Sequence, residues 1–226
     1  MPGRMIIAID GPSSAGKSTL GRMIARELNL LYVDTGAMYR AAALAVIEAR
    51  LRTTDAAAVA QVVESANIDL EGDPDSLRVS LDGRDVSEEI RSAQVSHTAS
   101  VISVIPEVRR TLVKRQREMG ARGGVVLDGR DISTVVFPEA DVKFFLTAVP
   151  EERAHRRYEE NRLRQRDLTF EETLADINTR DQRDSTRADS PLAIAEDAVV
   201  IDTTELSIEE VFERMMAVIR ERTGDV

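Results

Sequence analysis

The sequence predicts an α/β fold with a five-stranded, mainly parallel sheet and helices on both faces. Five short apolar segments read as buried strands, and helical patterns separate them along the chain. The first of these strands leads directly into a glycine-rich loop. Polar clusters also follow the second and third strands, and parallel sheets bind their ligands at these carboxyl ends. The five segments are residues 5–9, 30–33, 125–127, 142–146 and 198–202.

The first strand, loop and helix contain a phosphate-binding motif. The loop sequence GPSSAGKS fits G-x-x-x-x-G-K-[ST] at every fixed position. Lys17 would reach the β- and γ-phosphates of a nucleotide, and the Ser18 hydroxyl would ligate Mg²⁺. A chance glycine turn is the alternative, and the flanking strand and helix disfavour it. We therefore expect a P-loop NTPase core. Its triphosphate-binding residues would be Gly11, Pro12, Ser13, Ser14, Ala15, Gly16, Lys17, Ser18 and Thr19.

Helical patterns fill the intervals between the strands. The second strand should stop at Gly36, at the end of the polar sequence Asp34-Thr35-Gly36. An alanine-rich stretch then favours a helix. Towards the C-terminus, Thr169 and Ser207 each begin a capping box, which is typical of a helix start. The expected helices cover residues 37–50, 88–103 and 106–119, and others begin near Asp55, Pro150, Thr169 and Ser207.

Residues 66–90 interrupt the alternation of strands and helices. Residues 68–70, 77–81 and 84–86 alternate apolar and polar side chains with a period of two, as antiparallel strands do. An Asp-Gly pair at 82–83 is a strong hairpin signal. This pattern alone fits a surface hairpin and an inserted substrate-binding subdomain equally well.

Composition excludes several classes of protein. A chain of 226 residues forms one large domain, or one domain with an insert. It has no cysteine, so disulfides and thiolate metal sites are ruled out, and His97 and His155 form no ligand cluster. A net charge of −10 argues against a general nucleic-acid or anionic-membrane surface. No membrane span or signal peptide is recognisable. We therefore expect a cytoplasmic protein.

The three polar clusters should meet at one edge of the sheet and form one site. The glycine loop indicates a nucleoside triphosphate. The absence of an N-K-x-D motif disfavours a GTPase, and the absence of H-R-D and D-F-G motifs excludes a protein kinase. The chain is also too short and acidic for a nucleic-acid motor. A small-molecule kinase remains, and arginines should line its second anion site. The candidates are Arg40, Arg109, Arg130, Arg180, Arg183 and Arg187.

Arg130 is the strongest of these candidates, because it follows a buried strand and is flanked by aspartates. A single arginine on a helix is more often a solvated surface group. Arg180, Arg183, Asp184 and Arg187 share one helix face. That face is either a set of salt bridges or a phosphate clamp.

The chain contains five phrases in this order: GPSSAGKST, VDTGAMYRA, LDGRDISTVVFPEADVKFFL, ERAHRR and RDQRDSTR. Together they resemble bacterial cytidylate kinases over essentially the whole chain. The resemblance implies a nucleoside monophosphate kinase with a single domain over residues 1–226, a monophosphate-binding insert at 66–90 and a short lid near 153–167. It also implies Mg²⁺-dependent transfer of phosphate from ATP to CMP or dCMP, which gives CDP or dCDP. The insert is thus favoured over a decorative hairpin.

The resemblance also implies roles for residues at matching positions. The CMP phosphate contacts are Arg40, Arg130 and Arg187. The cytosine contacts are Ser100, Arg109 and Asp131. The sugar contacts are Arg180 and Asp184. The other expected members of the CMP site are Thr35, Tyr39 and Asp128. The expected catalytic residues are Lys17, Arg130 and Arg187.

The acceptor phosphate is mostly dianionic near neutral pH, so this reaction needs no general base. Alignment and charge stabilisation would carry catalysis, and closure of insert and lid would exclude water. Two other functions stay open. One is a kinase that acts on UMP or a non-nucleotide alcohol, and the other is a nucleotide-binding regulatory module without turnover. Asp131 also has two possible roles: it recognises cytosine, or it only holds Arg130 in place by a salt bridge. We expect a monomer that binds small nucleotides but neither nucleic acid nor membrane.

Overall fold

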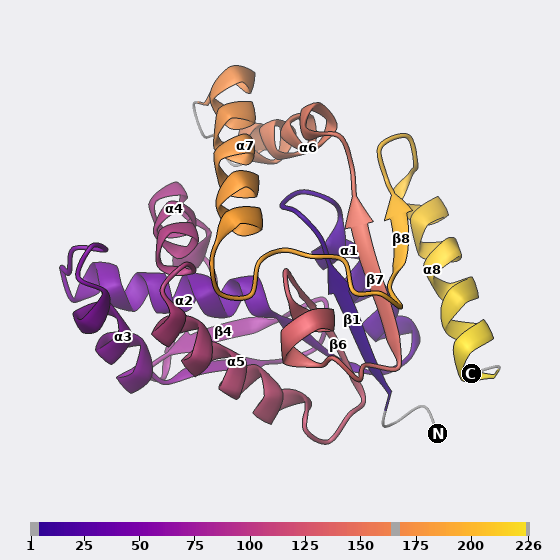
Figure 1. The fold of residues 1–226 in the computed structure, drawn as a ribbon, viewed down its shortest axis with the longest axis horizontal. Coiled ribbons are helices and arrows are strands. Elements are labelled where there is room, and N and C mark those ends of the chain that lie inside the picture. The colour runs from indigo at the N-terminus through magenta and orange to yellow at the C-terminus, as the bar shows by residue number, and fades with distance from the viewer. Residues whose placement is uncertain (1–4, 164–167, 225–226) are drawn as a thin grey trace.

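The computed structural model describes residues 5–163 and 168–224 and contains the predicted five-stranded parallel sheet (Figure 1). The strand order is β2-β6-β1-β7-β8, and all four strand pairs are parallel. The first strand of the chain is therefore the central one, between two strands from the second half. The strands are β1 (Ile6–Asp10), β2 (Leu31–Asp34), β6 (Val125–Gly129), β7 (Val142–Thr147) and β8 (Val199–Asp202).

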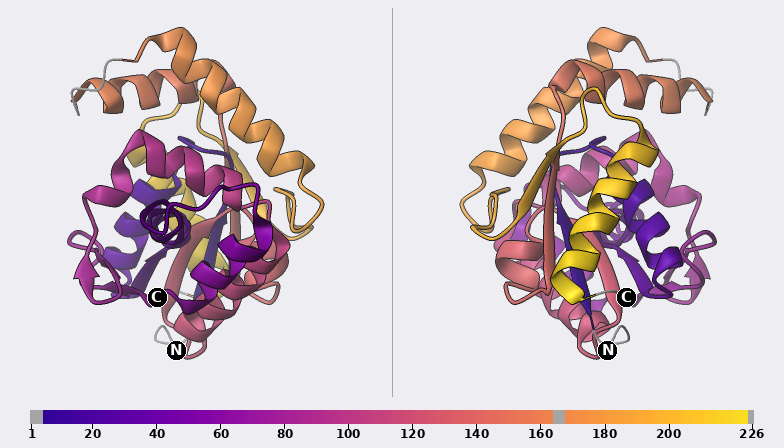
Figure 2. Two further views of the ribbon diagram at one scale, coloured as in Figure 1. Left: turned by 90° about the vertical axis from the view of Figure 1, so that its left-hand side faces the viewer. Right: turned by 90° about the vertical axis from the view of Figure 1, so that its right-hand side faces the viewer.

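Two hydrophobic clusters, one on each face of the sheet, hold the helices in place. Along β1, Ala8 belongs to one cluster and Ile7 and Ile9 to the other, because successive side chains of a strand point to opposite faces. Helices α2 to α5 pack into the first cluster, and α1 and α8 pack into the second (Figures 1 and 2). Their bounds are α1 Lys17–Glu27, α2 Thr35–Glu48, α3 Ala56–Ser65, α4 Ala93–Ile102, α5 Pro106–Gly120 and α8 Ile208–Thr223.

The inserted sheet has no separate core. Strands β3 (Ile68–Glu71), β4 (Arg78–Leu81) and β5 (Arg84–Asp85) pair antiparallel, as predicted. Asp82 and Gly83 take φ angles of 50° and 80°, which a tight hairpin turn requires. The buried side chains of this sheet join the cluster that contains α2, so its position depends on the larger domain. They are Ile68, Val79 and Leu81.

The charge-dense segment after β7 forms two helices that lie beyond the carboxyl edge of the sheet (Figures 1 and 2). They are α6 (Pro150–Leu163) and α7 (Phe170–Thr186). The predicted capping boxes are confirmed at Thr169, before α7, and at Ser207, before α8. The predicted lid covers most of α6, and its residues 164–167 lie outside the described part of the chain. None of the helices in the described ranges has the length and apolar character that crossing a bilayer requires.

Several element boundaries differ from the predicted ones by a few residues, and local hydrogen bonds explain two of these differences. β2 ends two residues early, because the Asp34 carboxylate accepts the N–H of Ala37 at 2.8 Å and thereby caps α2. The helix expected over 88–103 divides into a 3₁₀ turn, η2 (Glu89–Arg91), and α4. The division falls at Ser92, whose hydroxyl caps α4.

Candidate active site

The loop between β1 and α1 has a backbone that only glycine can provide at its start. Gly11 takes a φ of 144°, and a Cβ atom there would lie 2.0 Å from the carbonyl oxygen of Leu146. At the other end of the loop, Lys17 is buried and donates to the carbonyl oxygen of Pro12 at 2.6 Å. Burial and the neighbouring Arg130 hold the pKa of Lys17 well below its usual value. A phosphate chain beside this lysine would favour its charged form.

Asp128, near the end of β6, connects the loop to the second strand. Its carboxylate accepts hydrogen bonds from the hydroxyls of Ser18 at 3.0 Å and Tyr32 at 2.9 Å, and its carbonyl accepts one from Thr35 at 2.6 Å. Burial and the charge of Asp34 raise the pKa of Asp128 to about 6. A carboxylate beside a serine hydroxyl provides hard oxygen ligands, which a cation such as Mg²⁺ prefers.

Arg109 and Asp131 form a buried ion pair at the far end of the site. The Arg109 guanidinium donates to the Asp131 carboxylate and, at 3.3 Å, to the carbonyl oxygen of Ser103. It also lies 5.6 Å from the centre of the Tyr39 ring, within cation–π distance. Arg187 lies 3.9 Å from the second Asp131 oxygen. A strong donor and a strong acceptor are therefore held side by side.

Asp184 contacts two arginines of the site, Arg130 and Arg187. Its carboxylate accepts a hydrogen bond from Arg130 at 2.8 Å and lies 3.7 Å from the guanidinium of Arg187. The alternative interpretation, in which Asp131 holds Arg130 by a salt bridge, is therefore wrong. Arg130 and Asp131 are consecutive, but one side chain is directed to α7 and the other to α5. Burial lowers the pKa of Arg187. Burial alone would raise the pKa of Asp184, but the charges of Arg130 and Arg180 hold it below its usual value.

The arginine cluster has hydrogen-bond donors that no described residue accepts. Among the described residues, the Nε of the partly buried Arg180 has no hydrogen-bond partner, and neither has the terminal nitrogen of Arg187 that lies 3.9 Å from Asp131. Burial and the charge of Arg130 lower the pKa of Arg180 to about 10. Buried, unpaired donors are costly unless a ligand satisfies them. The cluster is therefore suited to an anion.

One pocket is lined by all eleven residues predicted to contact CMP, together with Lys17 and Ser18 of the loop. The fold thus brings together side chains from α2, α4, α5, β6, α7 and the residues that follow β6 and α7. The eleven are Thr35, Tyr39, Arg40, Ser100, Arg109, Asp128, Arg130, Asp131, Arg180, Asp184 and Arg187.

Arg183, the remaining candidate arginine, does not line this pocket. It donates to the hydroxyl of Ser100 at 2.7 Å and so connects α7 to α4. The residues of the predicted helix face therefore have different roles. Asp184 and Arg187 form part of the charge network in the pocket, whereas Arg183 positions a neighbouring side chain.

Sequence reasoning missed several residues of the site. Tyr32 lies within an apolar strand, so its pattern is that of a core residue. Asp34 belongs to a recognised polar cluster, but its partner Arg40, which donates to it at 3.0 Å, is visible only in the fold. Arg157 lines the pocket. No signal distinguished Arg157 from the other arginines of the lid segment.

Arg153, also in the lid segment, has a different position. It is buried and forms an ion pair with Asp181 of α7 at 2.6 Å. It also donates to the carbonyl oxygens of Ala148 at 2.8 Å and Ser13 at 3.4 Å. Arg153 therefore connects α6, α7 and the glycine loop rather than facing the pocket.

A second hollow lies beside residues 14–16 of the loop. Arg156 lines it and donates to the hydroxyl of Thr203 at 3.0 Å and to the carbonyl of the same residue at 2.6 Å. Apolar side chains beside a phosphate-binding loop suit the base of a nucleotide. Those of this hollow are Leu206, Ile208 and Val211.

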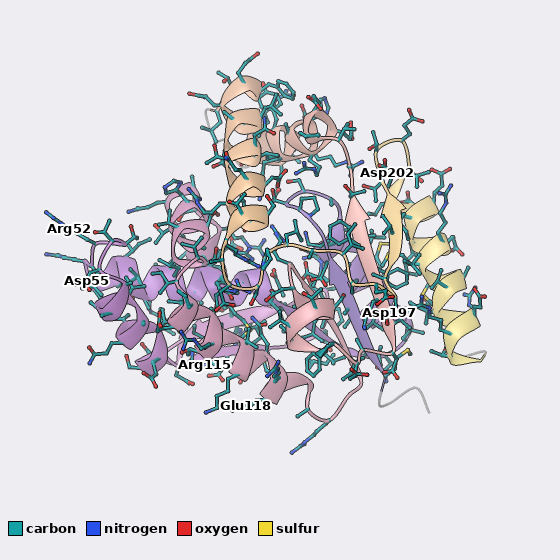
Figure 3. All side chains as sticks on the ribbon, viewed as in Figure 1. Arg52, Asp55, Arg115, Glu118, Asp197 and Asp202 are labelled. Carbon is teal, nitrogen blue, oxygen red and sulfur yellow. The ribbon has the colours of Figure 1, made fainter. Side chains whose placement is uncertain are left out.

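Charge alone does not mark the site, because charged side chains cover much of the molecule (Figure 3). What distinguishes the pocket is burial, since Arg109, Asp128, Asp131, Asp184 and Arg187 are each less than 10% exposed. The labelled side chains of Figure 3 lie on peripheral elements instead. They are Arg52, Asp55, Arg115, Glu118, Asp197 and Asp202.

The sequence matches one protein-family model, described as Cytidylate kinase, over residues 7–221. It is 51% identical to the cytidylate kinase of Caldanaerobacter subterraneus subsp. tengcongensis, over 96% of this chain and 95% of that one. It is 48% identical to the cytidylate kinase of Geobacter sp. strain M21, over 96% and 94% of the two chains. For the cytidylate kinase of Bacillus velezensis the identity is 44%, over 99% and 100%.

A solved structure shares the fold at low sequence similarity. The crystal structure of an uncharacterized protein from Eubacterium ventriosum superposes with a TM-score of 0.52 and 9% identity, over 96% of this chain and 99% of that one. This likeness supports the arrangement of strands and helices alone.

Proposed function

Because the chain belongs to the cytidylate kinase family, we propose that it transfers the γ-phosphoryl group of ATP to CMP and dCMP and releases ADP with CDP or dCDP. One observation carries the proposal. A single pocket contains the loop lysine, Lys17, and a cluster of arginines with unused donors. Two anionic substrates bound side by side in this pocket would pair with Lys17 and with the free donors of the arginine cluster.

We assign the triphosphate of ATP to the glycine loop and its base to the hollow beside residues 14–16. Backbone N–H groups of the loop and the N-terminus of α1 favour phosphate. Lys17, at the inner end of the loop, would contact the β- and γ-phosphates. The apolar hollow next to Arg156 then accommodates the adenine.

Ser18 and Asp128 are the residues that would hold Mg²⁺ with ATP. Within the described ranges, no three His, Cys, Asp or Glu side chains form a metal cage. Mg²⁺ in phosphoryl-transfer sites usually needs only one or two carboxylates besides phosphate oxygens and water. The Ser18–Asp128 pair, whose oxygens are 3.0 Å apart, fits that requirement. When bound, the ion neutralises charge on the triphosphate. Asp128 would then serve the metal, although the family resemblance places it among the CMP residues.

The acceptor phosphate binds between Arg40, Arg130 and Arg187 in this proposal. One of its oxygens attacks the γ-phosphorus while the bond to the β–γ bridging oxygen breaks, and ADP leaves with that oxygen. No proton has to be removed from the attacking dianion. Lys17 and the arginines stabilise the charge that spreads over the migrating group. Arg180 and Asp184, on α7, hold the sugar beside them.

Cytosine is assigned to Ser100, Arg109 and Asp131. Cytosine offers an amino donor at N4 and an acceptor at N3, and uracil has the reverse pattern. An ionised Asp131 can only accept, and Arg109 can only donate. The pair therefore complements cytosine, while Ser100 assists without discriminating.

Residues 66–90 and the lid segment are proposed to close over the substrates. Closure would exclude water, which would otherwise hydrolyse ATP. The whole chain then functions as one nucleoside monophosphate kinase domain. Its monomeric state and its cytoplasmic location stay predictions.

A coupled assay of ADP release from Mg²⁺-ATP tests the proposal. The panel of acceptors contains CMP, dCMP, UMP, dUMP, AMP, GMP and simple alcohols. We expect CMP and dCMP to give the highest kcat/KM by far. Preference for UMP or an alcohol would establish another small-molecule kinase, and binding of ATP without ADP release for any acceptor would leave a nucleotide-binding module without turnover.

A further inference from the structure

Asp10, the last residue of β1, is buried beneath the pocket and has no role in the reaction described above. Its two carboxylate oxygens accept the backbone N–H groups of Ile132 at 2.8 Å and Ser133 at 2.7 Å. Its side chain is only 1% exposed. Each oxygen of a buried carboxylate is thus committed to one backbone donor in a different part of the chain.

These donors begin an irregular turn that starts from Asp131. The turn, η3 (Ile132–Val136), is π-helical, and the carbonyl of Asp131 accepts the N–H groups of Val135 at 2.9 Å and Val136 at 3.1 Å. The first N–H groups of a helical turn have no acceptor within it. Asp10 supplies two such acceptors from the neighbouring strand. It therefore fixes the backbone that carries the Asp131 side chain.

We propose that Asp10 is a positioning residue that sets cytosine selectivity through Asp131. The inference rests on the proposed function, because it requires Asp131 to face the base. Displacement of the turn would change the position of Asp131 relative to Arg109, and so weaken the match to cytosine. Asp10 is also the residue before Gly11. One buried carboxylate therefore links the strand that begins the ATP loop to the turn that reads the base.

The variant Asp10→Asn tests this role. Its amide keeps one acceptor but turns an N–H₂ donor towards a backbone N–H, so one buried donor loses its partner. We expect the CMP to UMP ratio of kcat/KM to fall about 10-fold or more, mainly because the KM for CMP rises. The Kd of a non-hydrolysable ATP analogue, measured by calorimetry, should change less than about 2-fold, since the loop keeps its own contacts.

Asp141→Asn is the matched control. The Asp141 carboxylate accepts the N–H of Ile6 at 2.7 Å, at the opposite end of the same strand. This variant should keep the wild-type CMP to UMP ratio. If Asp10→Asn does not fold, Asp10→Ser is measured in the same way, because its hydroxyl oxygen can accept while its hydrogen rotates away from the backbone N–H groups.

The outcomes separate the inference from the proposed function. A wild-type enzyme without preference for CMP would refute the function. A wild-type enzyme that prefers CMP, with an unchanged ratio in the Asp10 variant, would overturn the positioning role even if total activity falls. The double variant with Asp131→Asn adds a second criterion. Asp10→Asn should cause no further loss of selectivity in that background, and an additive loss would contradict action through Asp131.

Discussion

The proposed donor loop and the proposed acceptor pocket would bind phosphate in opposite ways. Residues 11–18 are contiguous, and the conformation of their backbone decides what they bind. The acceptor pocket is assembled from side chains of distant elements, and aspartates hold its arginines in place, as Asp184 holds Arg130. A contiguous loop is sensitive to any change of shape, whereas an assembled pocket is sensitive to the loss of one charge. Substitutions in the two regions should therefore affect different steps.

The largest effect is expected from Lys17→Ala on the donor side. Loss of one such contact to the transferred group typically lowers kcat by ~10²–10³. The Kd for CMP, measured in the absence of ATP, should change little, because Lys17 serves the triphosphate. Steady-state kinetics and calorimetry check the two parts. Lys114→Ala is the control, since this lysine lies exposed on α5. Near-normal turnover of Lys17→Ala would refute the division between the regions.

The same division explains how much the sequence could predict. The strand, loop and helix of the donor region were predictable, because the motif is contiguous in the chain, and the contacts of its residues with ATP stay predictions. The parallel sheet, the inserted hairpin and both capping boxes also follow from local patterns, and all are confirmed. The patterns that predict them lie in residues that are neighbours in the chain, whereas the order of the strands in the sheet joins distant segments.

The pairing within the acceptor pocket could not be predicted in this way. The family resemblance supplied its members, but not that Arg130 pairs with Asp184 or that Arg183 holds Ser100. Those contacts depend on where α7 crosses the pocket. The π-helical turn after Asp131 was missed because the acceptor for its first N–H groups, Asp10, is far away in the chain.

Asp128→Asn should stabilise the protein at high pH. Asp128 lies where the two regions meet, so this variant also tests its role in catalysis. The pKa of Asp128 is about 6 in the folded state, above its ordinary value of 3.8. The contribution of Asp128 to the free energy of unfolding is thus fully present below about pH 4, where the group is protonated, and is lost as pH rises through about 6. An asparagine does not titrate, and its amide oxygen can accept from one of the two hydroxyls while its N–H₂ group donates to the other. At pH 8 the variant should be more stable by up to ~3 kcal/mol.

Thermal unfolding between pH 5 and pH 8, without nucleotide, measures this difference. The stability advantage of Asp128→Asn should shrink as the pH falls. Its turnover should be low at every pH, because a neutral amide is a poor ligand for Mg²⁺. An advantage that does not change with pH would show that the carboxylate is not responsible.

Asp131→Asn tests the acceptor side. The amide can donate as well as accept, so the preference for CMP over UMP should narrow, mainly through weaker use of CMP. A mismatched buried polar group costs about 1–3 kcal/mol, so kcat/KM for CMP should fall about 10-fold or more. The KM for ATP should stay near the wild-type value. A fall that is equal for CMP and UMP would show that Asp131 only supports Arg109, its ion-pair partner.

The smallest expected effect is on hydrogen exchange, which reports the motion of the insert and of α6. Each of the two ligands should slow exchange in a different one of these segments. The insert shares the cluster beneath α2, and on the side of α1 its loop contributes the partly buried Leu77 and an exposed ion pair between Asp75 and Arg26, at 3.4 Å. Such contacts open at low cost. CMP should therefore slow hydrogen exchange mainly in residues 66–90, by several-fold, and an ATP analogue mainly in α6.

Both ligands together should slow exchange in both segments, because closure requires the donor and acceptor regions to meet. The control is α8, which lies on the other face of the sheet from the insert and should exchange at the same rate in every state. Mass spectrometry of peptides from these segments gives the rates. Unchanged exchange in the insert and in α6 would contradict closure. Equal protection of both segments by CMP alone would show that the acceptor side controls the whole movement.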